Sequence, residues 1–134
     1  MMNTYLRWFS RAVWLGILLN LFWALPAIIV PHRVLAYLNL EPTLTPIWVS
    51  FAAWLVMLLT LFYLLAALDP QRYRANAWLA VLARIAVAIF FFCSVFCFSH
   101  SRAYLLFGLI ELFLGLSQGV LLFLAARVRE STAD

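Results

Sequence analysis

The residues that could do chemistry in this chain are few, and most of them lie inside long apolar stretches of the sequence. Two carry charge there, Arg84 and Glu111, and three more form a spaced series of thiols and an imidazole, Cys93, Cys97 and His100. A polar or charged group inside a membrane is costly without a partner, so it marks either a structural clasp or a functional site. These residues are the first candidates for a site.

Four polar residues, one from each long apolar stretch, are expected at a common depth in the membrane. A rise of about 1.5 Å per residue puts each of them roughly 10–12 Å from the cytoplasmic boundary. They are Asn20, Thr60, Arg84 and Gln118. An Arg at mid-membrane costs about 2.5–3.5 kcal/mol on insertion scales, so Arg84 needs compensation. We expect a hydrogen-bonded clasp in which carbonyl oxygens neutralise Arg84 and its side chain extends toward the cytoplasm. The alternative is a site for an anion, a lipid headgroup or a quinone oxygen.

Glu111 is the buried acid of the fourth stretch, expected roughly 12 Å from the outer boundary. Side chains lean toward the N-terminus of their own helix, so Arg84 and Glu111 are predicted to point away from each other. Without a cationic partner, desolvation favours the neutral acid. We therefore expect Glu111 to be protonated and bonded to an indole N–H, or paired with a group outside the chain. A proton-handling or partner-binding Glu111 is the alternative.

Small residues share the face of the fourth stretch that carries Glu111 and Gln118. They are Gly108, Gly115 and Gly119, and together these polar and small residues form a stripe about 100° wide. Small residues beside polar ones are typical of helix–helix interfaces in lipid, and Gly-x-x-x-Gly is the usual spacing. The stripe is predicted to be a packing surface.

The Cys93, Cys97, His100 series predicts one face at the outer end of the third stretch, where Phe96 lies nearby. Thiolates and an imidazole suit copper(I). However, free Cys usually behaves as a small apolar residue, and no fourth ligand is evident except the distant His32 at the end of the first stretch. We therefore expect no metal, and no haem between the two histidines. Because this face lies opposite Arg84, it is predicted to look toward lipid or a partner protein.

The composition shows which elements must position these residues. The chain has 134 residues, 68% hydrophobic and 10% charged, with a mean hydropathy of +1.05, against about 45–50% apolar and 25% charged in soluble domains. This excludes a soluble enzyme, a disordered chain and a disulfide scaffold. A span needs about 20 apolar residues, and its backbone must be hydrogen-bonded internally. We predict an all-α, four-transmembrane-helix bundle forming a single domain over residues 1–134, with spans at about 12–30, 47–68, 77–98 and 103–126.

The arginines predict the orientation. Six lie before the first span, between the second and third, or after the fourth, while only Arg33 and Arg102 lie on the other side. The positive-inside rule then puts both termini in the cytoplasm.

The arginines form no basic stripe, so no nucleic-acid partner is expected. The first stretch is expected to be a retained helix rather than a cleaved signal peptide. The segment between Pro31 and Pro46 is expected to hold a short helix in the membrane interface.

The chain resembles the DoxX-like group of small four-helix bacterial inner-membrane proteins. The resemblance rests on size, four spans, cytoplasmic termini, Arg7 and Arg11 before the first span, and Arg84 early in the third. The chain also looks like uncharacterised bacterial proteins over residues 62–74 and at Ala83-Arg84. Members of the DoxX-like group are often auxiliary to redox systems, so the resemblance implies an auxiliary role, and it carries over no catalytic residues.

These observations predict a non-enzymatic accessory or assembly subunit of a larger bacterial inner-membrane complex, of the redox class. Its expected partners are the lipid bilayer and other membrane subunits, with Cys93, Phe96, Cys97 and His100 as the partner face. The alternative is a small stand-alone carrier, or a lipid- or quinone-binding membrane protein, that uses Arg84 and Glu111. No cofactor is expected apart from a bound lipid or quinone in that alternative.

Overall fold

The computed structural model describes residues 4–40, 42 and 44–130, and the regular secondary structure of this part of the chain is all helical. The helices are α1 (Thr4–Ile29), α2 (Pro31–Tyr37), α3 (Ile47–Leu68), α4 (Arg74–Phe96) and α5 (Tyr104–Glu130). Four of them are long and apolar enough to cross a membrane, with 22 to 26 residues in the candidate spans. The predicted all-α, four-helix architecture is therefore confirmed.

The largest difference from the predicted spans lies at the start of α1, which begins at Thr4 rather than at residue 12. The first two turns are amphipathic rather than uniformly apolar. Leu6 and Phe9 are buried there, while Arg7 and Arg11 are exposed. A helix can extend beyond its apolar stretch when one face packs on the bundle and the other meets polar surroundings.

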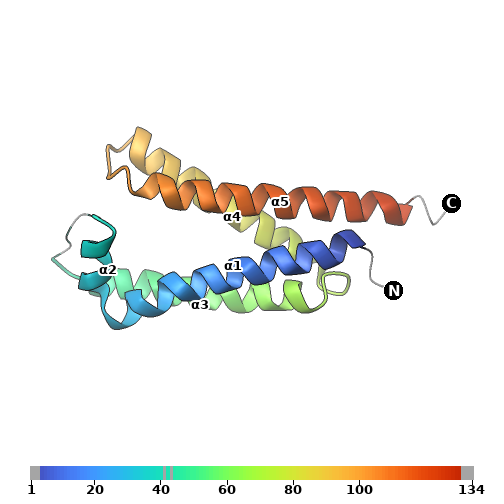
Figure 1. Ribbon diagram of the computed structural model, residues 1–134, viewed down its shortest axis with the longest axis horizontal. Helices are drawn as coiled ribbons and strands as arrows, with labels where there is room; N and C mark the ends of the chain where they lie inside the picture. Colours follow the sequence, from blue (N-terminus) through green and yellow to red (C-terminus); the bar gives the residue numbers. More distant parts are fainter. Residues whose placement is uncertain (1–3, 41, 43, 131–134) are drawn as a thin grey trace.

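The four long helices form two antiparallel hairpins (Figure 1). In one hairpin α1 packs along α3, and in the other α4 packs along α5; α1–α5 and α3–α4 contacts join the two. The start of α1, the end of α5 and the α3–α4 turn lie at one end of the bundle, which we call the terminal end. Helix α2 and the α4–α5 turn lie at the opposite end, which we call the α2 end.

The two ends differ in how the hairpins pack. At the terminal end a single apolar core takes residues from all four long helices, including Phe9, Tyr63, Ala80 and Leu122. Toward the α2 end the core cluster consists of Ala24, Ala27 and Ala53, which belong to α1 and α3 alone. The hairpins thus share one core at the terminal end, while toward the α2 end their ribbons lie farther apart (Figure 1) and the rings of Trp23 and Phe107, 5.4 Å apart, still join α1 to α5.

Helix α2 is the predicted short helix between the first two spans. Pro31 stands at its start, where the missing N–H of proline leaves no hydrogen bond unmade. Leu35 is buried, and Val34 packs on the small α1–α3 cluster. Helix α2 therefore covers the end of the first hairpin. At the same end Ser101 Oγ lies 3.4 Å from the Asn39 carbonyl oxygen, a weak bridge to the second hairpin.

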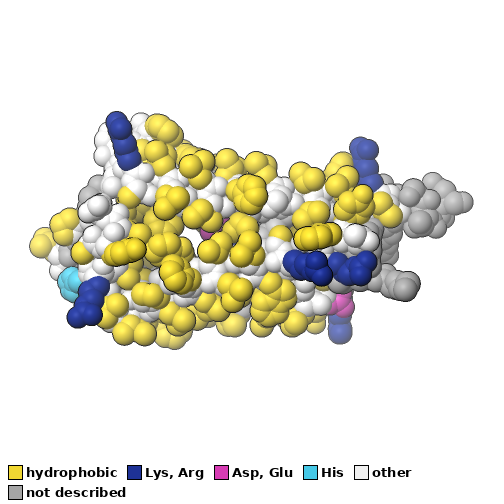
Figure 2. All heavy atoms as spheres, in the orientation of Figure 1, with side chains coloured by type: hydrophobic (Ala, Val, Ile, Leu, Met, Phe, Trp, Pro, Cys, Tyr) yellow, Lys and Arg dark blue, Asp and Glu magenta, His cyan; other side chains and the backbone are white. Residues whose placement is uncertain are grey.

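The surface matches a membrane environment. Figure 2 shows hydrophobic side chains over most of the visible face and basic side chains gathered at its two ends. Large apolar residues such as Leu18, Phe22 and Leu61 are more than half exposed along the middle of the helices. An apolar band of this extent is stable only when hydrocarbon covers it. The chain is a multi-pass helical membrane protein.

Candidate functional site

The central feature of the bundle is an ion pair between Arg84 and Glu111. Arg84 Nη1 donates to Glu111 Oε2 at 2.7 Å, the length of a charge-assisted hydrogen bond. The Arg84 side chain is 1% exposed and that of Glu111 is 19% exposed. The prediction that these side chains point away from each other was wrong, and Glu111 bonds to Arg84 rather than to an indole N–H.

The physical reason lies in the stagger of α4 against α5. Counting from the turn that joins them, Arg84 lies roughly 8 Å deeper than Glu111 at 1.5 Å per residue. A long Arg side chain can span this offset, so Arg84 turns toward the α2 end instead of extending toward the terminal end. The tilt toward the helix N-terminus fixes only the Cα–Cβ bond, and the outer part of a long Arg side chain can turn back. Neutralising a buried guanidinium outweighs it, since leaving one charge unpaired costs several kcal/mol.

Each of the other three long helices contributes one residue around the Arg84 guanidinium. Glu111 comes from α5, and the Tyr63 ring of α3 lies with its centroid 5.0 Å from Cζ, within cation–π range. From α1 comes Gly16, where a Cβ would overlap Nη2 and lie 2.8 Å from Cζ. We call Gly16, Tyr63, Arg84 and Glu111 the Arg84 hub. All four long helices meet at this point.

The hub is not fully hydrogen-bonded within the described part of the chain. Arg84 Nε and Nη2 are buried and have no hydrogen-bond partner there. Outside the hub, Gln118 Oε1 is also buried without a hydrogen-bond partner among the described residues. A buried N–H without a partner costs about 1–3 kcal/mol. The hub therefore keeps donor capacity that an additional acceptor could use.

The four predicted polar residues make three separate contacts among the described residues rather than one network. Asn20 Nδ2 donates to Thr60 Oγ1 at 3.0 Å and links α1 to α3. Gln118 Nε2 donates to the Ala12 carbonyl oxygen at 3.2 Å and links α5 to α1. Arg84 pairs with Glu111 instead of with carbonyl oxygens. Each contact joins two different helices, so the group acts as a set of clasps.

The structure places the three predicted packing glycines against α4. A Cβ at Gly115 would lie 2.8 Å from Ile85 Cδ1 and 3.2 Å from Arg84 Cβ. At Gly108 and Gly119 the nearest atoms would be 3.3 Å away, on Phe91 and Phe92 and on Val81 respectively. The stripe lets the α5 backbone approach α4 closely, and the approach is tightest beside the hub.

These distances predict a graded response to alanine. In Gly115→Ala, Ile85 and Arg84 must both move, and the overpacking exceeds the helix-propensity gain of about 1 kcal/mol, so we expect a net loss of about 1 kcal/mol. In Gly119→Ala a single contact must relax, so the two effects nearly cancel, to within about 0.5 kcal/mol. Unfolding by SDS titration in mixed micelles measures both. Equal losses for the two variants would contradict the graded packing.

The predicted partner face is partly rearranged. Cys93, Phe96 and Cys97 are exposed, and both cysteines are free. However, α4 ends at Phe96, and Ser99 adopts a left-handed φ of 57°. His100 therefore lies in the turn, where its ring is 6.5 Å from that of Tyr104, and the expectation that it shares a helical face with the cysteines was wrong. Among the described residues, no group of three or more His, Cys, Asp or Glu side chains could hold a metal ion.

Three contacts escaped the sequence analysis. Gly16 and Tyr63 complete the hub, and Ser10 Oγ donates to the Ala67 carbonyl oxygen between α1 and α3. Gly16 carried a signal, because it lies one helical turn before Asn20 on the same face. The sequence gives no signal that distinguishes Tyr63 or Ser10 from the other residues of their helices.

Comparison of the chain with models of known protein families, with curated proteins and with solved structures gave no match. The fold and the hub therefore define the class on their own, a multi-pass helical membrane protein held together by an internal ion pair.

Proposed function

We propose that the chain is a non-catalytic accessory or assembly subunit of a larger membrane complex of the redox class, in the bacterial inner membrane with both termini in the cytoplasm. The observation that carries this proposal is the internal use of the polar groups in the spans. Arg84, Glu111, Asn20, Thr60 and Gln118 all bond to neighbouring helices of the same chain. Such a bundle is a self-contained scaffold that offers its outer faces to other proteins.

The outer end of α4 is the face proposed for the partner. Cys93, Phe96 and Cys97 are exposed together there, beside Phe98. Aromatic side chains are enriched in protein interfaces. The arginines support the orientation, because Arg7, Arg11, Arg72, Arg74, Arg127 and Arg129 belong to segments at the terminal end.

The test is the mass of the assembly after extraction of the tagged protein from its native membrane in a mild detergent. We expect stoichiometric co-purification of other chains. Cys93→Trp should lower their yield at least tenfold, about 1.4 kcal/mol of association free energy. Leu109→Trp is the matched control, because Leu109 is 57% exposed on α5, and it should retain the partners. A wild-type protein that runs alone would overturn the proposal.

The second candidate function is a small carrier, or a lipid- or quinone-binding protein, that uses Arg84 and Glu111. Two observations favour it: Glu111 remains 19% exposed, and two Arg84 nitrogens have no partner among the described residues. Figure 2 shows acidic side-chain atoms at one place within the apolar surface, midway along the bundle. The double variant Arg84→Met with Glu111→Leu separates the two functions, since it removes both charges. A carrier would lose its transport, whereas a scaffold would still assemble.

A further inference from the structure

Basic side chains gather at the terminal end of the bundle, where the structure describes five exposed arginines (Figure 2). None of the five forms an ion pair with a carboxylate that the structure describes. They are Arg7 and Arg11 on α1, Arg72 and Arg74 around the α3–α4 turn, and Arg127 on α5. Their charge is therefore free to attract an external anion.

Arg7 and Arg11 are the pair best suited to hold one. They lie one helical turn apart on α1, so their side chains leave the same face of the helix. Residues 1–11 contain no Asp or Glu, whereas the arginines of the α3–α4 turn lie beside Asp69. Arg11 Cζ is 4.9 Å from the centroid of the Trp8 ring, and Arg7 Nη2 donates to Thr4 Oγ1 at 3.3 Å, which leaves the other N–H groups of its guanidinium free. We call Arg7, Trp8 and Arg11 the Arg7–Arg11 site.

The depth of this site in the membrane is that of the lipid headgroups. The apolar part of α1 begins at residue 12, directly after Arg11. Arg7 lies about 6 Å farther out at 1.5 Å per residue, and the headgroup layer of one leaflet is about 5–7 Å thick. Trp8 is more than half exposed, and Trp is enriched at this level of membrane proteins. Both guanidiniums therefore lie level with lipid phosphates rather than in bulk water.

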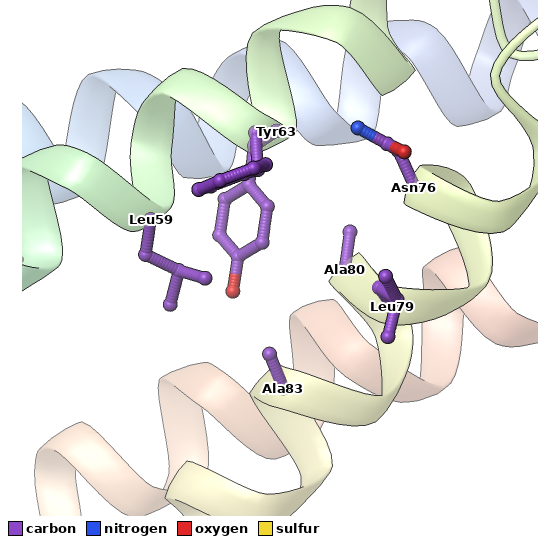
Figure 3. Close-up of a pocket in the computed structure, with 7 residues that line it drawn as sticks. Leu59, Tyr63, Asn76, Leu79, Ala80 and Ala83 are labelled. Carbon is purple, nitrogen blue, oxygen red and sulfur yellow. The ribbon is translucent and has the colours of Figure 1, made fainter.

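The pocket near the start of α4 differs from this site. It measures about 260 Å³ and lies between α3 and α4, with Leu59 and Tyr63 on one side and Asn76 and Ala80 on the other (Figure 3). No charged residue lines it. A lipid phosphate would meet no cation there, so the pocket does not compete with the Arg7–Arg11 site for a headgroup.

The chemistry of two adjacent guanidiniums selects the kind of headgroup. Each guanidinium is a planar fork that can donate two parallel hydrogen bonds to the oxygens of a phosphate. A phosphatidylcholine headgroup carries its own cation, which the neighbouring arginines repel. A phosphatidylglycerol headgroup has a net negative charge and no cation. The excess of arginine at the terminal end therefore favours the anionic lipid.

We propose that the Arg7–Arg11 site binds an anionic phospholipid of the phosphatidylglycerol class, in the leaflet that the terminal end faces. The phosphate lies between the two guanidiniums, with the Trp8 ring beside the glycerol backbone. The acyl chains run along the same face of α1, over Leu15 and Leu18, which are at least half exposed. The proposal holds for either orientation of the chain and does not depend on the accessory-subunit proposal.

The test is native mass spectrometry of the full-length protein in a non-ionic detergent, titrated with phosphatidylglycerol or with phosphatidylcholine of the same acyl chains. We expect the first phosphatidylglycerol to bind about 10- to 30-fold more tightly than phosphatidylcholine. Arg7→Gln with Arg11→Gln should remove most of this difference. Arg33→Gln with Arg102→Gln is the matched control, because it removes the same charge from exposed residues at the α2 end, and it should keep the difference.

Equal affinities of the wild type for the two lipids would overturn the proposal, as would equal losses of preference in the two double variants. Displacement of bound phosphatidylglycerol by soluble glycerol phosphate would assign the site to a free phosphate, and displacement by an oligoglutamate peptide would assign it to an acidic partner protein. Either displacement would also overturn the proposal. Co-purification of other chains tests the accessory-subunit proposal separately, so the failure of one proposal is distinguishable from the failure of the other.

Discussion

Glu111→Leu will destabilise the bundle by roughly 3–5 kcal/mol, the range observed when one partner of a buried ion pair is removed. The variant leaves the Arg84 guanidinium, 1% exposed, without its only hydrogen-bond partner among the described residues. Arg cannot lose its proton to escape this cost. SDS titration in mixed micelles, followed by tryptophan fluorescence, measures the change in unfolding free energy.

The reverse variant should be milder. Arg84→Met leaves Glu111 unpaired, but the Glu111 side chain is 19% exposed and is therefore less desolvated than Arg84, which is 1% exposed. The double variant Arg84→Met with Glu111→Leu should recover most of the lost stability, because an apolar pair of similar volume often replaces a buried ion pair at little cost. If the double variant is as unstable as the sum of the two single variants, the ion pair is not the source of the loss.

Gly16→Ala carries the second largest expected effect, a loss of about 2–3 kcal/mol from overpacking against Arg84. The added Cβ would overlap Nη2 and lie 2.8 Å from Cζ. The guanidinium cannot swing aside without loss, because Nη1 is held by Glu111 and the Tyr63 ring lies against it. The loss therefore exceeds the gain of about 1 kcal/mol that Ala brings to a helix.

A double-mutant cycle isolates this contact. In an Arg84→Met background the guanidinium is absent, so Gly16→Ala should cost less than about 1 kcal/mol, which corresponds to a coupling of more than about 1 kcal/mol between the two positions. The same SDS titration provides the four free energies. Additive effects of Gly16→Ala and Arg84→Met would show that Gly16 does not make room for the guanidinium.

The spans were predictable because apolar length is a strong signal in a membrane protein. The ends of the spans were less predictable. The first two turns of α1 mix exposed Arg7 and Arg11 with buried Leu6 and Phe9, so a measure of average hydropathy misses them. The periodic spacing of the buried residues was the better guide there.

The site was predictable as a set of residues but not as a set of partners. Arg84 and Glu111 were identified because each is costly alone. Their pairing depends on the stagger of α4 against α5, which is set by the turn between the helices. The same turn determines the position of His100. Helix α4 ends at Phe96, and no Gly or Pro follows directly that would predict this end from the sequence. Tyr63 joins the hub through the spacing of α3 and α4, a tertiary property that no local pattern contains.

The ion pair also bears on how the protein enters its membrane. Both charges belong to one hairpin, α4 and α5, whose helices are joined by a short turn. Helix α4 inserted alone would carry an unpaired Arg into the hydrocarbon, at about 2.5–3.5 kcal/mol on insertion scales. Together with α5 it enters as a neutralised unit, before the first hairpin has packed against it. The second half of the chain can thus be integrated as a pair during synthesis, and Gly16 and Tyr63 are needed only when the two halves come together.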